Sequence, residues 1–129
     1  MARRPTEGPT DAELEILNIL WQRGKATVRE VYETLNRVRP TGYTTALKML
    51  QIMLEKGQVE RDDHSRTHVY AAAMPRSAVQ QMQLASMVDR LFDGSCAHMV
   101  LHAIRDKRVS PTEIEAIQQV LREYERGSA

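Results

Sequence analysis

Residues 27–57, TVREVYETLNRVRPTGYTTALKMLQIMLEKG, decide the fold. Their first helix opens with a capping box, because Thr27 is followed three residues later by Glu30. This helix ends before the proline of the stretch, since the residue that precedes a proline avoids helical backbone angles. Thr41 is suited to cap a second helix, which the apolar spacing predicts over 43–56. Two helices separated by so short a break predict a helix-turn-helix.

The flanking residues extend this unit to a winged helix. Thr10 and Glu13 form another capping box, which opens an earlier helix that ends at Gly24. After the helix 43–56, helical spacing gives way to two short extended segments, 58–61 and 67–71, which predict a β-hairpin. The order helix, helix, break, helix, hairpin is that of a winged helix-turn-helix.

The last third of the sequence predicts three further helices, over 76–92, 96–106 and 111–126. Apolar residues cover well over half the circumference of the first of them, so that helix must be covered on two sides. A second copy of the chain is the simplest source of this cover, and packing against the winged helix is the alternative. The residues expected at the dimer interface are apolar and lie on these three helices: Met82, Leu84, Val88, Leu91, Phe92, Met99, Ile117 and Leu121.

The expected fold class is therefore mainly α with a small β-wing. A winged helix-turn-helix domain is predicted over 1–72, followed by a helical dimerisation domain over 73–129. Two such winged domains joined by a two-fold interface would read a palindromic DNA site.

Composition excludes several classes of protein. The chain has 129 residues, of which 42% are apolar and 27% charged, as is typical of a folded globular protein. Its longest run of small and apolar residues, over 69–74, is far too short to span a membrane, and no signal-peptide pattern appears. The single cysteine, Cys96, cannot form an internal disulfide and suits a reducing compartment. We therefore expect a cytoplasmic protein without membrane insertion.

Catalytic and metal-binding motifs are weak or missing. The sequence has no nucleophile turn, Gly-rich phosphate loop or paired-carboxylate motif, so we expect neither an enzyme nor a cofactor. His98 and His102 are four residues apart on one predicted helix, a spacing at which two imidazoles can share a metal ion. Cys96, however, projects roughly 160° away from His98 on that helix. The expectation is a buried cysteine, two histidines on a polar helix face and no metal site.

The helix predicted over 43–56 has a polar face that suits DNA. Thr44, Thr45 and Lys48 lie on this face, followed by Gln51, and no acidic residue occurs there before Glu55. In major-groove readers the N-terminal residues of the helix reach base edges, while hydroxyls and lysine reach phosphates. Threonine can also contact a thymine methyl, and glutamine can bridge adenine. An ordinary solvated helix face is the alternative. The opposite, apolar face is expected to be core: Tyr43, Ala46, Leu47, Leu50, Met53 and Leu54.

The net charge of the whole chain, +1, hides a basic segment. Residues 23–48, which include Arg29, contain six basic residues against two acidic ones, whereas residues 49–63 contain two against four. Such a segment supplies the sequence-independent part of DNA affinity. Arg3 and Arg4 could form a DNA-binding arm, although a disordered end is the stronger expectation.

The tip of the predicted hairpin carries a second candidate contact. Arg66 lies there between His64 and His68 and is expected to reach a phosphate or the minor groove. Asp62 and Asp63 weaken this expectation, and a solvated hairpin arginine is the alternative.

Five short segments make the sequence similar to the penicillinase repressor (BlaI/MecI) family. They are ILNILW at 16–21, TVREV at 27–31, GYTTA at 42–46, EKGQV at 55–59 and SRTHVY at 65–70. The resemblance implies a homodimeric winged-helix repressor of operators that control β-lactamase or other stress-response genes. It also implies induction through a membrane-bound sensor metalloprotease, which triggers cleavage of the repressor in its dimerisation region. By position, the resemblance assigns DNA contacts to Tyr43, Thr44, Thr45, Lys48 and Arg66.

The sequence departs from the pattern of that family in two places and differs from its copper-responsive branch in a third. Ile52 stands where the family often has arginine, which removes a phosphate or base contact and suggests a different operator. The Asn-Phe bond that is cleaved in the best-known members falls near His102–Ala103, so cleavage at that bond is in doubt. With Cys96 alone, the chain lacks the paired cysteines of the copper-responsive branch.

The function expected from the sequence is that of a repressor that binds a palindromic operator through the helix 43–56 and the wing 58–71. Two alternatives stay open at this point. One is a metal-responsive repressor, and the other is a winged-helix protein-interaction module that does not bind DNA.

Overall fold

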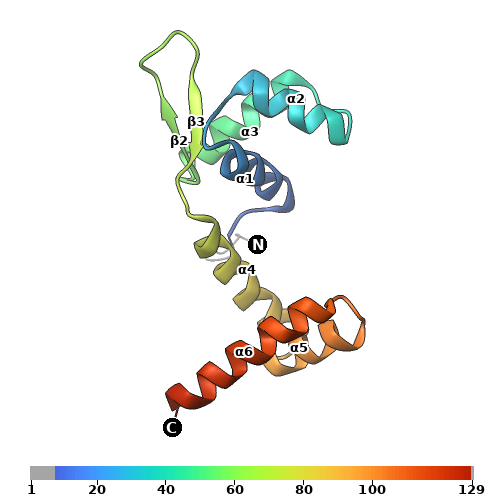
Figure 1. Ribbon diagram of the computed structural model, residues 1–129. Helices are drawn as coiled ribbons and strands as arrows, with labels where there is room; N and C mark the ends of the chain where they lie inside the picture. Colours follow the sequence, from blue (N-terminus) through green and yellow to red (C-terminus); the bar gives the residue numbers. More distant parts are fainter. Residues whose placement is uncertain (1–7, 129) are drawn as a thin grey trace. The chain divides into compact units, whose positions relative to one another are not determined.

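A computed structural model describes residues 8–128, which form six helices and three short strands (Figure 1). Arg3 and Arg4, the candidate arm, lie outside the described residues. The elements in chain order are α1 (Asp11–Arg23), β1 (Ala26–Thr27), α2 (Val28–Val38), α3 (Tyr43–Glu55), β2 (Val59–Asp62), β3 (Val69–Ala72), α4 (Arg76–Leu91), α5 (Cys96–Arg105) and α6 (Pro111–Ser128). The fold class is therefore the predicted one, a mainly helical winged helix-turn-helix followed by three helices. None of the described helices is both long and apolar enough to span a membrane.

Three helices begin as the sequence predicts, each with a complete capping box. In each box the hydroxyl of the N-cap residue accepts a hydrogen bond from the backbone N–H of the glutamate three residues later, and the carboxylate of that glutamate accepts one from the N-cap backbone N–H. The three pairs are Thr10 with Glu13, Thr27 with Glu30, and Ser110 with Glu113. The prediction that Thr41 caps α3 is wrong. Gly42 is its N-cap, and the Thr41 hydroxyl instead donates to the Arg39 carbonyl at 3.0 Å.

The wing hairpin, β2 and β3, belongs to a three-stranded antiparallel sheet in the order β1-β3-β2. The predicted hairpin is confirmed, although its strands lie one to two residues further along the chain than expected. The two-residue strand β1 was not predicted from the sequence. It pairs Ala26 with Tyr70 and so ties the start of α2 to the wing.

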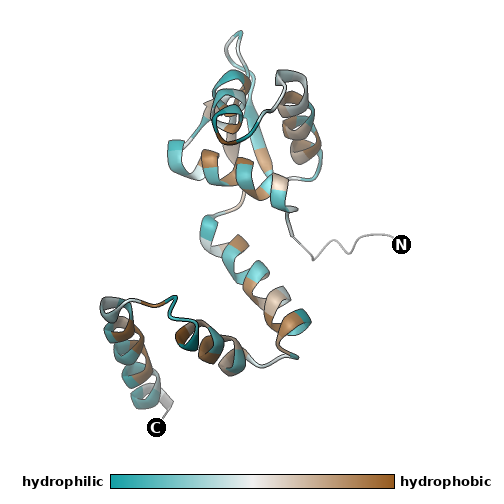
Figure 2. Ribbon diagram, turned by 90° about the vertical axis from the view of Figure 1, so that its right-hand side faces the viewer, coloured by the Kyte–Doolittle hydropathy of each residue, from teal (hydrophilic) through white to brown (hydrophobic). Residues whose placement is uncertain are grey.

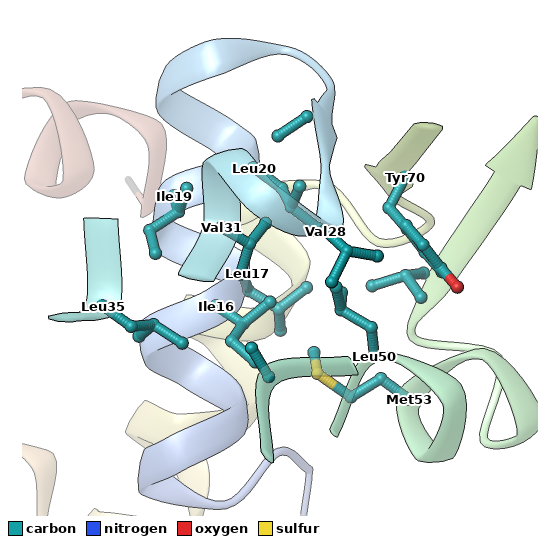
Figure 3. Close-up of a cluster of buried hydrophobic side chains, with 13 residues drawn as sticks. Ile16, Leu17, Ile19, Leu20, Val28, Val31, Leu35, Leu50, Met53 and Tyr70 are labelled. Carbon is teal, nitrogen blue, oxygen red and sulfur yellow. The ribbon is translucent and has the colours of Figure 1, made fainter. Parts of the chain in front are cut away.

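The core of the winged helix lies between α1, α2, α3 and the sheet. Figure 3 shows side chains of the three helices converging beside Tyr70 of β3, among them Leu17 of α1 and Leu50 of α3. The buried face of α1 is wide, since Ile16 and Ile19 are buried as well as Leu17 and Leu20. This wide burial arises because α1 contacts both α2 and β3.

The chain divides by its contacts into two compact units, with the division after Leu84. Residues 73–84 contact the winged helix: the Trp21 indole Nε1 donates to the Met74 carbonyl at 2.9 Å, and Gln83 Nε2 donates to the Pro9 carbonyl at 3.2 Å. The division into domains after residue 72 stays a prediction of the sequence.

The second unit, from Ala85 onward, leaves half of its large apolar side chains exposed and buries almost none of the others fully. Among its described residues Val88 alone is buried, and Figure 2 shows hydrophobic residues on all three of its helices. The exposed residues of this unit are Met87, Leu91, Val100, Leu101, Val120, Leu121 and Tyr124. Leu84, at the end of the first unit, is exposed as well.

Candidate nucleic-acid interface

The N-terminal half of α3 presents an exposed polar face. Thr44, Thr45, Lys48 and Gln51 are all exposed, whereas Ala46, Leu50 and Met53 on the opposite side are fully buried. Burial of one face therefore fixes which side of α3 is turned to solvent. The hydroxyls of Thr44 and Thr45 lie in the first turn, where backbone N–H groups and the helix dipole also favour an anion.

Tyr43 was expected in the core and is instead 42% exposed at the start of α3. Its ring meets the ring of Tyr32 edge-on at 5.6 Å between centroids. The guanidinium carbon of Arg29 lies 5.8 Å from the Tyr43 centroid, within range of a cation–π interaction. These contacts from α2 hold Tyr43 and place the charge of Arg29 beside the first turn of α3.

The turn between α2 and α3 is fixed by side chains. The Thr41 backbone N–H donates to Asn36 Oδ1 at 3.0 Å, and Arg39 forms an ion pair with Glu15 of α1. This long-range pair was not predicted from the sequence, which offers no signal for it. It removes Arg39 from the cations that are free to meet a ligand.

Several basic side chains of the winged helix are not paired with an acidic residue. The side chains of Arg37, Lys48 and Arg66 form no hydrogen bond or ion pair with any residue of the described part of the chain. Arg23, in contrast, bonds to Glu30 at 2.6 Å. Unpaired cations can bind phosphates without first breaking an internal ion pair.

Asp62 and Asp63 in the wing are each paired with a basic side chain of the same hairpin. Arg61 Nε lies 2.7 Å from Asp63 Oδ1, and His64 Nδ1 lies 2.6 Å from Asp62 Oδ1. Hydrogen bonds from the backbone and the ring of His64 hold the pKa of Asp62 below its usual range, and the charge of nearby Lys25 adds to this effect. The two carboxylates therefore weaken the case for Arg66 less than the sequence alone indicated.

Of the three residues that the sequence offers as metal ligands, the structure brings only His98 and His102 close together. The rings of His98 and His102 lie 4.9 Å apart, and both contact Phe92. Cys96 is exposed, so the expectation that it is buried is wrong. Within residues 8–128, no group of three or more possible ligands is brought together.

Comparison with known proteins identifies the family. The family model described as "Penicillinase repressor" matches residues 9–123. The "Transcriptional regulator BlaI" of Mycobacterium tuberculosis (strain ATCC 25618 / H37Rv) is 32% identical over 122 residues, which is 91% of this chain and 85% of the relative. The "Penicillinase repressor" of Bacillus licheniformis is 26% identical over 115 residues, 89% of this chain and 90% of the relative. Both relatives are named as regulators, which agrees with the expectation that this chain is not an enzyme.

A solved structure gives the same result for the fold. The solution structure of the DNA binding domain of the repressor BlaI has a TM-score of 0.50 and 26% identity to this chain. It aligns with 60% of this chain and 92% of its own. The chain therefore belongs to the penicillinase repressor (BlaI/MecI) family of winged-helix DNA-binding regulators.

Proposed function

We propose that this protein is a homodimeric repressor that binds a palindromic operator, with α3 in the major groove and the wing against the neighbouring backbone. One observation carries this proposal. One face of the N-terminal half of α3 is exposed, free of acidic residues and equipped with an unpaired Lys48. In a winged helix these are the positions that enter the groove.

Each candidate contact has a role that follows from its chemistry. Thr44 and Thr45 contact base edges or phosphates, and Gln51 hydrogen-bonds to adenine. Lys48 and Arg66, which are unpaired, bind phosphates, with Arg66 doing so from the wing. Arg29 binds a phosphate by exchanging its long, exposed ion pair with Glu33, at 3.8 Å, for the DNA backbone. Tyr43, the first residue of α3, contacts DNA at the N-terminal end of the helix.

The apolar surface of the second unit supports dimerisation. Of the residues expected at the interface, Val88 is buried, while Met82, Phe92, Met99 and Ile117 are half-buried and Leu84, Leu91 and Leu121 are exposed. Monomeric proteins rarely leave so many large apolar side chains in water, so a second copy is the natural cover. Two-fold symmetry of such a dimer then requires a palindromic operator.

Lys48→Ala is expected to weaken binding to a duplex selected from a random-sequence DNA pool. Each lysine–phosphate contact that is lost lowers the slope of log K against log salt by about 0.9, hence by roughly two for a dimer. Fluorescence anisotropy between low and moderate salt measures this slope. Lys107→Ala, which removes a lysine between α5 and α6, is the matched control and should leave the slope unchanged.

Two results would contradict the proposal at different levels. An unchanged slope for Lys48→Ala removes Lys48 from the contacts. Failure of the wild-type protein to bind any duplex at low salt supports the protein-interaction module instead.

We further propose that induction proceeds through a sensor protease pathway that leads to a cut in the second unit, because a cut in this unit disrupts the dimer. We also propose that the cut does not fall at His102–Ala103. That bond lies within α5, where the His102 carbonyl accepts from Asp106 N–H at 3.0 Å and the Ala103 carbonyl from Arg108 N–H at 3.2 Å. Proteases bind their substrates in extended form, so a cut there first requires the helix to unwind.

Limited proteolysis with a protease of broad specificity is expected to cut the turns over 93–95 and 106–110 before any bond inside α5. Residues 93–94 adopt positive φ angles between two helices, and both are exposed. Mass spectrometry of the first fragments locates the cut. A first cut between His102 and Ala103 would show that α5 opens more readily than the turns.

A further inference from the structure

The tip of the wing carries two histidines beside its arginine. The side chain of His64 is 98% exposed, and that of His68 is about half exposed. His64 is held by Asp62, whose Oδ1 accepts from the His64 backbone N–H at 2.9 Å and lies 2.6 Å from the ring Nδ1. His68 Nε2 lies 3.6 Å from Asp63 Oδ1, a longer contact.

The contact with Asp62 fixes which ring nitrogen of His64 carries the proton. Hydrogen bonds from His64 lower the pKa of Asp62, so this carboxylate is ionised at neutral pH and can only accept a hydrogen bond. Nδ1 must therefore carry a proton, and in neutral His64 the other nitrogen, Nε2, bears a lone pair. A lone pair is repelled by a phosphate oxygen, whereas a protonated Nε2 donates to it.

The charge of the whole hairpin depends on the same two side chains. Residues 59–72 contain two arginines against three acidic residues, which gives a net charge of −1 when both histidines are neutral. With both protonated, the hairpin carries +1. Histidine is the side chain that ordinarily makes this change between pH 5 and pH 8.

We propose that the wing is a proton-dependent DNA contact, in which protonated His64 donates from Nε2 to the DNA backbone beside Arg66, with His68 contributing charge. The inference rests on the proposed binding of operator DNA. The negative potential of the minor groove attracts exposed cationic side chains, histidine included. The groups that face the two rings are Asp62 and Asp63 of the hairpin itself, with Lys25 near Asp62 and Arg61 on Asp63.

Operator affinity is expected to rise on the order of tenfold as the pH falls from 8 to 6, because DNA binding takes up protons at the wing. The slope of log K against log salt should also be steeper by about two at pH 6, since each wing of the dimer gains a phosphate contact. Both quantities are measured by anisotropy with the duplex selected from the random pool, at constant ionic strength for the pH series.

Two histidine variants make the test specific. His64→Gln is expected to abolish most of the pH dependence, so that its affinities at pH 6 and pH 8 become nearly equal. His98→Gln, which replaces a histidine of α5, is the matched control and should retain the full dependence.

The outcomes separate this inference from the function on which it rests. Binding that is strong at pH 8 and does not change at pH 6, or a His64→Gln variant with unaltered pH dependence, overturns the wing proposal alone. Loss of the dependence in His98→Gln would move the effect to the second unit and also overturn it. Absence of DNA binding at every pH instead contradicts the proposed function.

Discussion

The double variant Leu91→Asp/Leu121→Asp is expected to be a monomer and to bind a two-half-site operator about 10² to 10⁴ times more weakly than the wild type. Leu91 is 68% exposed on α4 and Leu121 is 54% exposed on α6. Burying one leucine side chain contributes roughly 2 kcal/mol, and a dimer buries each of them twice. A monomer also loses the second half-site, which otherwise binds at high effective concentration.

Sedimentation equilibrium measures the first part of this prediction. The wild type should have twice the chain mass of 14.7 kDa at micromolar concentration, and the variant should have the chain mass. Val38→Asp is the matched control for the mass, because Val38 is 74% exposed but lies on the winged helix. A wild-type monomer, or a variant that remains dimeric, would place the interface elsewhere.

The positions of the helices followed from signals that are local in sequence. Each of the three capping boxes uses two side chains three residues apart, so a short segment contains all the chemistry needed to recognise it. Gly24 and Gly57 end α1 and α3 with positive φ angles, which glycine adopts without strain. Strand β1 could not be recognised in this way, since two residues become a strand only by pairing with β3 from a distant part of the chain.

The sequence predicted which face of α3 is exposed, but it did not predict which basic side chains near this face are unpaired. Helical spacing alone placed Thr44, Thr45 and Lys48 opposite the buried side of α3. A count of local charge could not reveal that Arg39 is paired with Glu15, 24 residues away, and that Lys48 is unpaired. Tyr43 was misplaced for the same reason, because its position depends on Tyr32 and Arg29 of the preceding helix.

Glu13→Ala is expected to lower the free energy of unfolding of the winged helix by about 3 kcal/mol. Glu13 is only 5% exposed, and its two carboxylate oxygens have three partners from two parts of the fold. Lys56 Nζ lies 2.7 Å from Oε2, while Oε1 accepts from Thr10 N–H at 2.9 Å and from Gln58 Nε2 at 3.2 Å. Alanine removes the glutamate half of the capping box, which accepts from Thr10 N–H, and also leaves the buried amide of Gln58 without this acceptor.

Chemical denaturation followed by fluorescence of the single tryptophan, Trp21 of α1, reports on this unit directly. A loss of about 3 kcal/mol corresponds to a fall in Tm of roughly 15 °C. Glu30→Ala is the matched control. It removes the same position of the second capping box, but Glu30 is much more exposed and its other partner, Arg23, reaches solvent. A clearly smaller loss is expected there, and equal losses would mean that Glu13 acts only as a cap.

Acid should erase the contribution of Glu13. Burial alone raises its pKa, but hydrogen bonds from Lys56, Thr10 and Gln58 outweigh burial and hold the pKa below the ordinary value of 4.5. A carboxyl whose pKa is lowered by folding stabilises the folded state above its unfolded pKa and loses this effect as the pH falls through the folded one. The stability gap between wild type and Glu13→Gln should therefore be full at pH 7 and narrow below about pH 4.5. A gap that stays constant to pH 3 would show that the charge of Glu13 contributes nothing and that its shape and neutral hydrogen bonds alone matter.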